Sequence, residues 1–472
     1  MQQQRGAITA VIVALACLLA MPAMAQVDHT SFITGPIASG PEATQKCLEC
    51  HEDQAMDFMK TSHWNWALEQ EVHGQEVFRG KRDAINNFCT SVSANEIFCS
   101  GCHAGYGMED VKSFDFTDKT KIDCLVCHDN TGTYKKAAGT GGLPASNLDL
   151  LNIAQNVGMP VRDNCGTCHF FGGGGDAVKH GDLDSSMSYP DRATDVHMDA
   201  DGPDFQCQEC HKTANHQITG NSLGVSPTGN SHFGCTQCHE AAPHGESRLN
   251  AHAEAVACQT CHIPYFAKNI ATKMSWDWST AGDDAKEHAA DNKDKYGKHT
   301  YVKKKGTFEY GKMVQPEYAW YQDGAADAYL PGEKMDPSKV TKLAYPTSTI
   351  KDKEAKIYPF KVHRGQQIYD KNHKVFITAK VYGKGGYWKD FDWDKAAKLG
   401  MDENPIMIEK GLKYSGEYGF APTEMYWRIN HMVSPAEDAL KCLDCHGDNG
   451  RMDWKALGYK GDPMSNKKWA RK

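Results

Sequence analysis

Sixteen of the 18 cysteines in this chain of 472 residues fall into eight copies of the pattern Cys-x-x-Cys-His. Two thiols at this spacing can both add to the vinyl groups of one porphyrin, while the adjoining histidine reaches the iron as an axial ligand. Zinc sites also use Cys-x-x-Cys pairs, but they need no histidine directly after the second cysteine. Disulfide pairing within the pattern is disfavoured as well. The pattern therefore predicts eight covalently bound c-type haems.

We number the predicted haems 1 to 8 in chain order. Their attachment cysteines are Cys47 and Cys50, Cys99 and Cys102, Cys124 and Cys127, Cys165 and Cys168, Cys207 and Cys210, Cys235 and Cys238, Cys258 and Cys261, and Cys442 and Cys445. Their proximal histidines are His51, His103, His128, His169, His211, His239, His262 and His446.

Distal ligands must come from elsewhere in the chain. Of the 22 histidines, eight belong to the motifs and 14 remain. Seven lie where a distal ligand is expected, four of them within six residues of a motif: His63, His197, His216, His232, His244, His252 and His431. The alternative for each is a surface histidine or one that binds a haem propionate. That alternative carries more weight in polar or terminal surroundings, as for His29, His73, His288, His299 and His373.

Seven candidates for eight distal positions leave one haem without an obvious histidine. An iron held between two histidines has no vacant site and only passes electrons, whereas a weak sixth ligand lets a substrate bind. The count therefore predicts one catalytic haem among seven that relay electrons.

The first 25 residues are typical of a secretory signal. A short positive region ending at Arg5 precedes an apolar run over residues 7–20 and an Ala-Met-Ala cleavage site, which leaves Gln26 as the first mature residue. A lipoprotein signal at Cys17 is less favoured, because the next three residues continue the apolar run. No later stretch approaches the roughly 18 apolar residues that span a bilayer. We expect a periplasmic protein without a membrane span.

Composition agrees with a protein whose interior is partly porphyrin. Hydrophobic residues make up only 40% of a chain long enough to bury large cores. The net charge of −8 does not suggest nucleic acid as a partner. An acidic surface instead suits a basic redox partner, so the expected partners are a small inorganic anion as substrate and a periplasmic or membrane-anchored cytochrome as electron donor.

The spacing of the motifs divides the mature chain into a haem-dense domain (26–262), a haem-free segment (263–441) and a tail with the eighth haem (442–472). We expect a mainly α fold with much irregular structure, a haem-stacking core and a small β element in the haem-free segment. Residues 375–382 alternate as a strand does, in a hairpin, and residues 424–433 suit a helix that leads to the last haem.

The haem-free segment is rich in aromatics and lysines. It either only wraps the haems or provides basic residues that line a passage for anions. His363 and Arg364, next to Lys361, could orient an anion, with a salt-bridged loop as the favoured alternative. Residues 303–305, all lysine, are better explained as solvated surface.

The chain resembles the octahaem tetrathionate reductase family of periplasmic cytochromes. The resemblance covers essentially the whole mature chain: seven early motifs, one late motif, and the segment Gly-Gly-Gly-Gly-Asp-Ala-Val-Lys-His-Gly-Asp at residues 172–182. It implies that haem 2, with His103 as proximal ligand, is the catalytic haem and that Lys179 replaces histidine on its distal side. It also places Asp176 and the unpaired Cys89 beside that iron.

Residue chemistry makes a lysine ligand reasonable, because lysine binds iron only as the neutral amine and burial lowers its pKa. Asp176 lies about one helical turn before Lys179 if the segment is helical, so it could hold the ammonium after Lys179 leaves the iron. We hypothesise such a ligand switch. Without the family, His180 would be favoured over Lys179 as the ligand. No Cys-x-x-Cys-Lys motif occurs, so any lysine must enter from the distal side.

Cys89 is the only cysteine after the predicted signal that lies outside a haem motif. The alternatives are a buried, inert thiol and a thiolate that attacks a sulfur–sulfur bond of the substrate. We expect reduction of small inorganic oxyanions, above all tetrathionate to thiosulfate, with nitrite and hydroxylamine as further substrates that the resemblance suggests. A non-catalytic electron carrier and a hydroxylamine-oxidising enzyme are the alternatives.

Overall fold

The structure is a computed structural model that describes residues 28–220, 223–228 and 234–471. The expected signal peptide and His232 therefore lie outside the described residues. Helices account for 25% of the chain and strands for 19%. The expectation of a mainly α fold with a small β element is corrected, because the strands of the haem-free segment form a nine-stranded sheet.

Short helices carry most of the haem motifs. A single helical turn places residues i and i+3 on one face, so the two cysteines of a motif can point to the same side. The helices are α2 (Gly40–Leu48), α3 (Glu52–Phe58), α4 (Ser62–Asn65), α5 (Glu96–Cys99), α6 (Leu125–His128), α7 (Leu150–Gln155), α8 (Arg162–His169), α9 (Cys207–Cys210), α10 (Ser247–His252), α11 (Cys258–His262), α12 (Asp284–Glu287), α13 (Tyr387–Asp390), α14 (Trp393–Glu403), α15 (Pro405–Glu409) and α16 (Cys442–Cys445).

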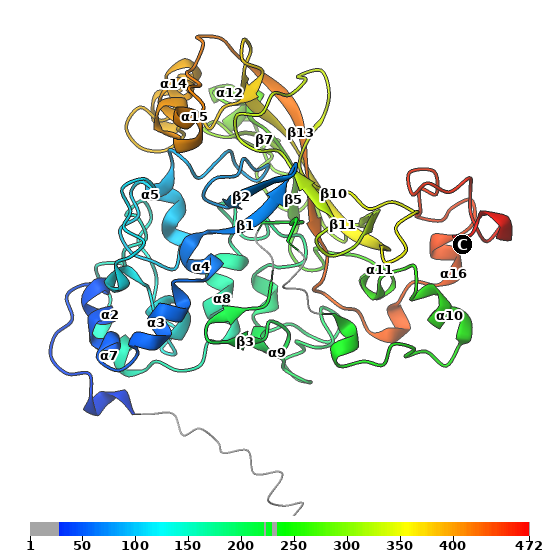
Figure 1. The fold of residues 1–472 in the computed structure, drawn as a ribbon, viewed down its shortest axis with the longest axis horizontal. Helices are drawn as coiled ribbons and strands as arrows, with labels where there is room; N and C mark the ends of the chain where they lie inside the picture. Colours follow the sequence, from blue (N-terminus) through cyan, green and yellow to red (C-terminus); the bar gives the residue numbers. More distant parts are fainter. Residues whose placement is uncertain (1–27, 221–222, 229–233, 472) are drawn as a thin grey trace, which may run out of the picture.

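The sheet lies above the haem-motif segments in Figure 1, with α14 and α15 at one end of it. Its order is β6-β7-β5-β11-β13-β10-β9, and β8 and β12 also pair with β11. The strands are β5 (Thr272–Asp277), β6 (Tyr301–Val302), β7 (Gly306–Gly311), β8 (Glu317–Tyr321), β9 (Ala326–Ala328), β10 (Thr341–Pro346), β11 (Lys356–Asp370), β12 (Val375–Phe376) and β13 (Tyr418–Arg428). Two separate hairpins are β1 (Ala67–Val72) with β2 (Gln75–Gly80), and β3 (Thr213–Ala214) with β4 (Gln217–Ile218).

The prediction of a helix over residues 424–433 is wrong, because its first half, residues 424–428, belongs to β13 and the second half forms no helix. From Ala421 to Trp427, every second side chain of β13 is buried, which is the period of a strand and not of a helix. The strand pairs with β11 over its whole length, from Tyr418 opposite Asp370 to Arg428 opposite Phe360. Its aromatic residues favour this pleated, half-buried surface.

The predicted strand over residues 375–382 forms only in part. The hairpin is present, since β12 pairs with β11 through Phe376 opposite Tyr369. Beyond β12, a side chain replaces the neighbouring strand: Asn95 donates to the carbonyl oxygen of Ala379 (3.0 Å) and accepts from the backbone N–H of Val381 (2.7 Å). The backbone carbonyl and N–H groups there have hydrogen-bond partners although no strand lies beside them.

One face of the sheet packs against the loop that contains Cys89. Asn87 donates to the carbonyl oxygen of His363 (2.6 Å), and Gln367 donates to that of Cys89 (2.9 Å). His363 and Gln367 both belong to β11. The haem-free segment thus reaches the first haem motifs.

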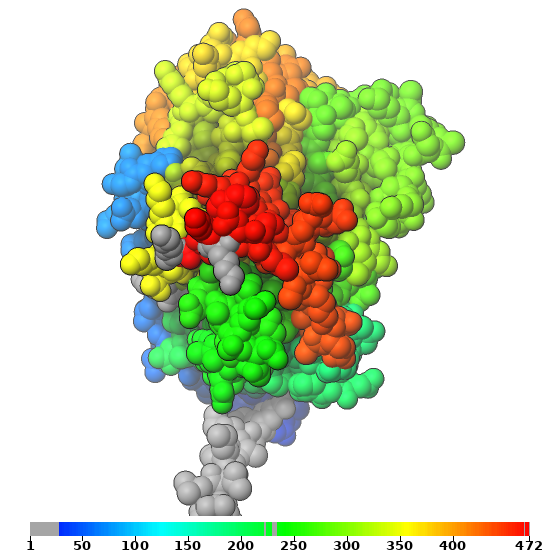
Figure 2. All heavy atoms as spheres, turned by 90° about the vertical axis from the view of Figure 1, so that its right-hand side faces the viewer, coloured from blue at the N-terminus to red at the C-terminus, as the bar shows by residue number. Residues whose placement is uncertain are grey.

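Figure 2 shows the C-terminal residues in red beside the green segment that contains α10. The contact includes the rings of His446 and His252. Among the described residues, no helix combines the length and apolar character that a membrane crossing requires.

Candidate haem centres and catalytic site

Seven motif histidines each have a second histidine ring at nearly the same distance. A metal-bound imidazole nitrogen lies about 2 Å from the metal and the ring centre roughly 1 Å further, so two imidazoles on opposite sides of one metal have centres roughly 6 Å apart. The observed pairs are His29–His51 (6.4 Å), His128–His216 (6.3 Å), His63–His169 (6.2 Å), His211–His431 (6.2 Å), His197–His239 (6.1 Å), His244–His262 (6.1 Å) and His252–His446 (6.3 Å). This spacing fits seven irons between two histidines.

In several of these rings a hydrogen bond occupies Nδ1, so Nε2 is the nitrogen that can bind a metal. Nδ1 is paired with the carbonyl oxygen of Gly158 in His128 (2.8 Å), with that of Thr219 in His211 (2.8 Å), and with Asp462 in His446 (2.6 Å). A partner at Nδ1 fixes the ring and leaves Nε2 as the ligand. The residues present therefore fit haem iron.

Sequence reasoning missed His29, which we expected in a surface role. It lies 6.4 Å from His51, although 22 positions separate the two histidines along the chain. The other predicted distal histidines among the described residues, which are His63, His197, His216, His244, His252 and His431, all lie beside a motif histidine. The only signal that could have identified His29 was the lack of a distal ligand for haem 1.

His103 of haem 2 is the exception among the motif histidines. Its ring neighbours are Trp66 (5.2 Å), Trp64 (5.6 Å), Phe114 (5.6 Å) and Phe116 (6.4 Å), and none among the described residues is a histidine. Its Nε2 pairs with the carbonyl oxygen of Trp64 (2.6 Å), and its buried Nδ1 has no partner. Burial lowers the pKa of His103 to about 3, so this ring is neutral.

Lys179 lies next to the attachment site of haem 2. Its ammonium interacts electrostatically with the thiols of Cys102 and Cys168, and its Nζ lies 5.1 Å from the ring centre of Trp427 and 5.6 Å from that of Phe88. Burial, with a smaller effect from the nearby Lys81, lowers the pKa of Lys179 to about 7. A substantial fraction of the side chain is therefore the neutral amine that a metal requires.

His180 points to a different haem. Its ring lies 6.3 Å from that of His169, the motif histidine of haem 4, and 5.2 Å from Trp427. His169 thus has two histidine neighbours, His63 and His180, while His103 has neither. This arrangement favours Lys179 over His180 as the group that faces haem 2.

Asp176 does not lie one helical turn from Lys179. Residues 172–181 form turns, with φ values of 81° at Gly173, 87° at Gly174 and 60° at Ala177. The carboxylate of Asp176 accepts from the backbone N–H (3.0 Å) and the hydroxyl (2.5 Å) of Ser185. Asp176 therefore anchors the glycine-rich segment to the following loop, and the helical premise of the sequence analysis is wrong.

Cys89 is half-buried and lies beside Cys99, the first attachment cysteine of haem 2. Its backbone is fixed on both sides, since its N–H donates to Asn86 (2.9 Å) and its carbonyl oxygen accepts from Trp278 Nε1 (2.9 Å). Burial raises the pKa of the thiol, and the ammonium groups of Lys305 and Lys273 oppose that rise. The structure thus brings Cys89, Cys99, Cys102 and Lys179 together.

The sheet fixes the glycine-rich segment through Lys361, which is fully buried on β11. Its Nζ donates to the carbonyl oxygens of Val178 (3.0 Å) and Lys179 (3.2 Å) and to Thr272 Oγ1 (2.7 Å). Arg364, in contrast, is exposed and pairs with Glu317 (2.7 Å) and Glu424 (3.3 Å). The salt-bridged alternative therefore describes Arg364, and Lys361 is an anchor that sequence reasoning did not find.

The attachment cysteines connect the haem sites into one series. The cysteine side chains of different motifs lie next to each other in four pairs: Cys47 with Cys124, Cys102 with Cys168, Cys165 with Cys207, and Cys235 with Cys258. Electrostatic contacts add Cys127 with Cys165, Cys210 with Cys238, and Cys261 with Cys445. Haem sites 1, 3, 4, 5, 6, 7 and 8 follow one another in this order, and site 2 joins at site 4.

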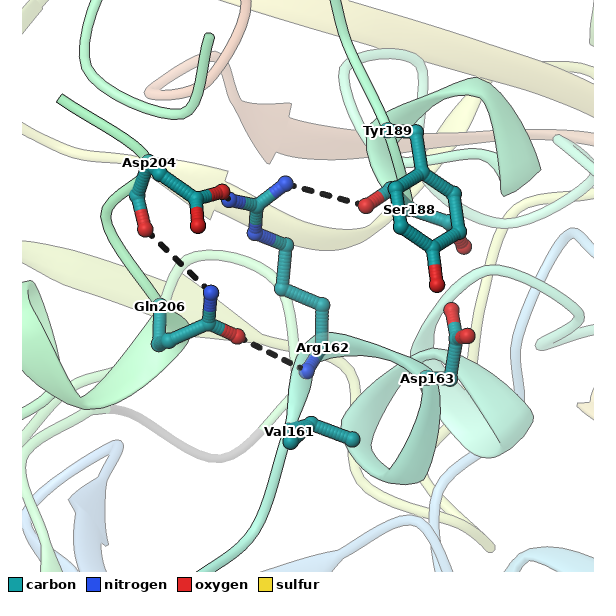
Figure 3. Close-up of a pocket in the computed structure, with 7 residues that line it drawn as sticks. All are labelled: Val161, Arg162, Asp163, Ser188, Tyr189, Asp204 and Gln206. Carbon is teal, nitrogen blue, oxygen red and sulfur yellow. Dashed lines mark hydrogen bonds and ion pairs between the residues drawn. The ribbon is translucent and has the colours of Figure 1, made fainter. Parts of the chain in front are cut away.

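A surface cavity beside α8 has a structural explanation (Figure 3). Its central side chain is Arg162, the first residue of α8, which donates to the carbonyl oxygens of Phe205 (3.2 Å) and Ser188 (2.9 Å) and pairs with Asp204. Because each guanidinium nitrogen has a partner, Arg162 ties the helix of haem site 4 to the segment before haem site 5.

Comparisons with known proteins agree with this arrangement. The family described as "Cytochrome c bacterial" matches residues 273–449. An uncharacterised protein of Archaeoglobus fulgidus is 23% identical in a match of 251 residues that covers 42% of this chain and 82% of that protein. The crystal structure of an octahaem cytochrome c from Shewanella oneidensis is similar to this chain with a TM-score of 0.89 and 62% identity, over 94% of this chain and 99% of that one. With this similarity and eight attachment motifs, the chain belongs to the octahaem c-type cytochromes and carries eight covalently bound haems.

Proposed function

We propose that the protein is a periplasmic reductase of small inorganic anions, which cleaves tetrathionate to thiosulfate at haem 2. The observation that carries the proposal is that His103 has no histidine ring opposite it in the described part of the chain, whereas the other seven motif histidines do. The haem iron, when bound, supplies electrons and a Lewis-acid centre. Nitrite and hydroxylamine are further proposed substrates.

The proposed distal ligands follow from the ring distances. Lys179 serves haem 2, and the other seven haems have two histidine ligands each, with the distal ones being His29, His216, His63, His431, His197, His244 and His252 for haems 1, 3, 4, 5, 6, 7 and 8. The seven haems relay and store electrons that a donor cytochrome delivers.

Lys179 acts as the exchangeable ligand in this proposal. With the haem bound, the neutral amine of Lys179 would hold the iron at rest and would give way to an anion. Once the amine is protonated, the ring faces of Trp427 and Phe88 hold the ammonium, because aromatic faces attract cations. These rings thereby take the role that we first assigned to Asp176.

Cys89 is the proposed nucleophile for the sulfur substrate. Its thiolate attacks an inner sulfur of tetrathionate, the central sulfur–sulfur bond breaks, and one thiosulfate leaves while the other half stays bound as Cys–S–S–SO₃⁻. Two electrons then cleave this mixed disulfide, which releases the second thiosulfate and restores the thiolate. Lysines around Cys89 favour the thiolate, as their effect on its pKa indicates.

Ligand uptake by the reduced holoprotein tests the proposal. We expect one carbon monoxide bound per chain, and none after Lys179→His, which gives haem 2 a strong sixth ligand. The same substitution should lower tetrathionate and nitrite reduction by about 100-fold, as for loss of a group at a reaction centre. If the unaltered protein takes up no carbon monoxide, it is an electron carrier instead. Turnover of hydroxylamine only in the oxidative direction would favour the hydroxylamine-oxidising alternative.

A further inference from the structure

Four lysines surround Cys89 and the attachment site of haem 2 without a carboxylate partner. Lys81, Lys179, Lys273 and Lys305 make no ion pair within the described residues, and no hydrogen-bond acceptor there pairs with their Nζ atoms. A fifth lysine nearby, Lys136, does have a carboxylate partner, since it forms an ion pair with Asp123 (3.0 Å). The four lysines therefore differ from Lys136 in having no carboxylate partner among the described residues.

Two of these lysines lie on the side of Cys102. Lys81 follows β2, and its Nζ lies 5.1 Å from the ring centre of Trp66. Its charge acts on Cys99, Cys102 and Lys179. Lys81 and Lys179 thus form one pair beside the haem 2 motif.

The other two lysines lie on the side of Cys89 and come from the haem-free segment. Lys273 of β5 is buried, with its Nζ 4.0 Å from the ring centre of Trp276 and 3.5 Å from that of Phe308. Lys305 lies between β6 and β7, with its Nζ 5.4 Å from the ring centre of Trp388. Both ammonium groups act on the Cys89 thiol.

The two pairs are close to each other. A Cβ atom built on Gly174, in the segment that carries Lys179, would lie 3.9 Å from the Nζ of Lys305. Cys89, beside the second pair, interacts with Cys99, beside the first. Cys89 therefore lies beside the second pair and next to Cys99, which interacts with Lys81 of the first pair.

Aromatic rings lie next to the Nζ atoms of all four lysines. A ring face attracts a cation but, unlike a carboxylate, does not neutralise its charge. Clustered charges without counter-charges are costly, and burial with the neighbouring Lys305 lowers the pKa of Lys273 well below its ordinary value. The cluster is thus stabilised by an anion that enters it.

We propose that the two lysine pairs bind the two sulfonate ends of a dianion whose central sulfur–sulfur bond lies beside Cys89. Lys273 and Lys305 hold one end, and Lys81 with Lys179 holds the other. The inference rests on the proposed function and deepens it, since it makes the site selective for polythionate dianions over small monoanions such as nitrite and over neutral hydroxylamine.

The alkylation rate of Cys89 reports the effect of the nearby lysine charges on an approaching anion, and its measurement needs no turnover. In the holoprotein the haem cysteines are thioethers, so Cys89 is the free thiol after the predicted signal. We expect the rate with anionic iodoacetate, divided by the rate with neutral iodoacetamide, to fall by roughly five- to tenfold in Lys305→Gln. The ratio should recover in Lys305→Arg and stay unchanged in Lys304→Gln, which removes the same charge from an exposed neighbour.

Binding of ethane-1,2-disulfonate, a dianion that the haems cannot reduce, tests directly whether the two lysine pairs bind a dianion. By titration calorimetry on the oxidised holoprotein, Lys305→Gln should weaken this binding by about tenfold, and methanesulfonate, with one charged end, should bind far more weakly than the dianion. In turnover, the KM for tetrathionate should rise in Lys305→Gln while that for hydroxylamine stays constant.

Equal disulfonate binding by Lys305→Gln and Lys304→Gln would overturn the inference. So would a changed haem 2 spectrum in Lys305→Gln with unchanged disulfonate binding, because Lys305 would then pair with a haem propionate. Neither the binding nor the alkylation measurement needs turnover. A protein that binds the dianion but does not reduce tetrathionate would therefore contradict the proposed function and still support dianion binding by the two lysine pairs.

Discussion

At the scale of single residues, neighbours in the chain have separate roles. Lys179 faces the cysteines of haem 2, whereas His180 lies beside His169 of haem 4. The attachment cysteines and proximal histidines could be predicted because the reaction with one porphyrin requires a fixed local spacing. Six distal histidines were among the candidates because most lie near a motif in the chain, and Lys179 was named only through the family resemblance. His29 was missed, since it reaches its position beside His51 only through folding.

Cys89→Ser should impair tetrathionate reduction much more than nitrite reduction. A serine hydroxyl cannot form the mixed disulfide with the sulfur substrate, whereas nitrite needs only the exchangeable position at haem 2. Steady-state rates with the two substrates and the same electron donor measure the difference. Equal losses for both substrates would refute a nucleophilic role for Cys89.

His29→Ala should create a second open iron. Removal of the imidazole leaves haem 1 with His51 alone, so the reduced variant should bind two carbon monoxide molecules per chain where the unaltered protein binds one. The matched control is His373→Ala, because His373 pairs with the carbonyl oxygen of Lys413 (2.9 Å) and with no motif histidine. An unchanged stoichiometry in His29→Ala would rule out the assigned ligand.

At the scale of elements, β11 and the loops that pack on it position the proposed catalytic groups. The sequence predicted short helices around the haem motifs, and the structure has them. It did not predict the large sheet, because β13 mixes small, aromatic and charged residues whose period is clear only when burial is known. The early end of the predicted strand at β12 was missed for a similar reason, since Asn95, which replaces the neighbouring strand there, lies far away in the chain.

Lys361→Met should release the glycine-rich segment without unfolding the protein. Methionine keeps most of the buried volume but loses the three donated hydrogen bonds to Val178, Lys179 and Thr272. We expect a mixed ligand state at haem 2 by electron paramagnetic resonance and a lower reduction rate. The control, Lys380→Met, breaks the ion pair with Glu403 away from the segment (2.8 Å) and should leave both unchanged.

Helix α5, which ends at Cys99, should make stability depend on pH through Glu96. Burial raises the pKa of this carboxyl from 4.5 to about 7. Between these values the folded state keeps a proton that the unfolded state loses, so the contribution of Glu96 is present below pH 4.5 and is lost as the pH rises through about 7. The loss is on the order of 2–3 kcal/mol.

Glu96→Gln removes this titration. The unfolding midpoint of the holoprotein, measured by thermal melting at pH 5 and pH 7.5, should therefore change less with pH in the variant than in the unaltered protein. An identical pH dependence in both proteins would show that Glu96 is ionised in the folded state.

At the scale of the whole molecule, haem site 2 joins the series at site 4 and not at an end. Two arms therefore lead to it, one through site 3 to site 1 and the other through sites 5, 6 and 7 to site 8 beside the C-terminal residues (Figure 2). The number of haems was predictable from the motifs. Their connection was not, because it depends on contacts between cysteines of different motifs.

The anchoring of the glycine-rich segment by Lys361 also bears on biogenesis. The motif of haem 2 emerges early in synthesis, while β11 follows far downstream. A growing chain can therefore receive several haems before the sheet exists to hold Lys179 and Cys89 in place. Reactivity toward substrates should consequently arise only in the finished protein, which protects maturation intermediates from chemistry at an incomplete centre.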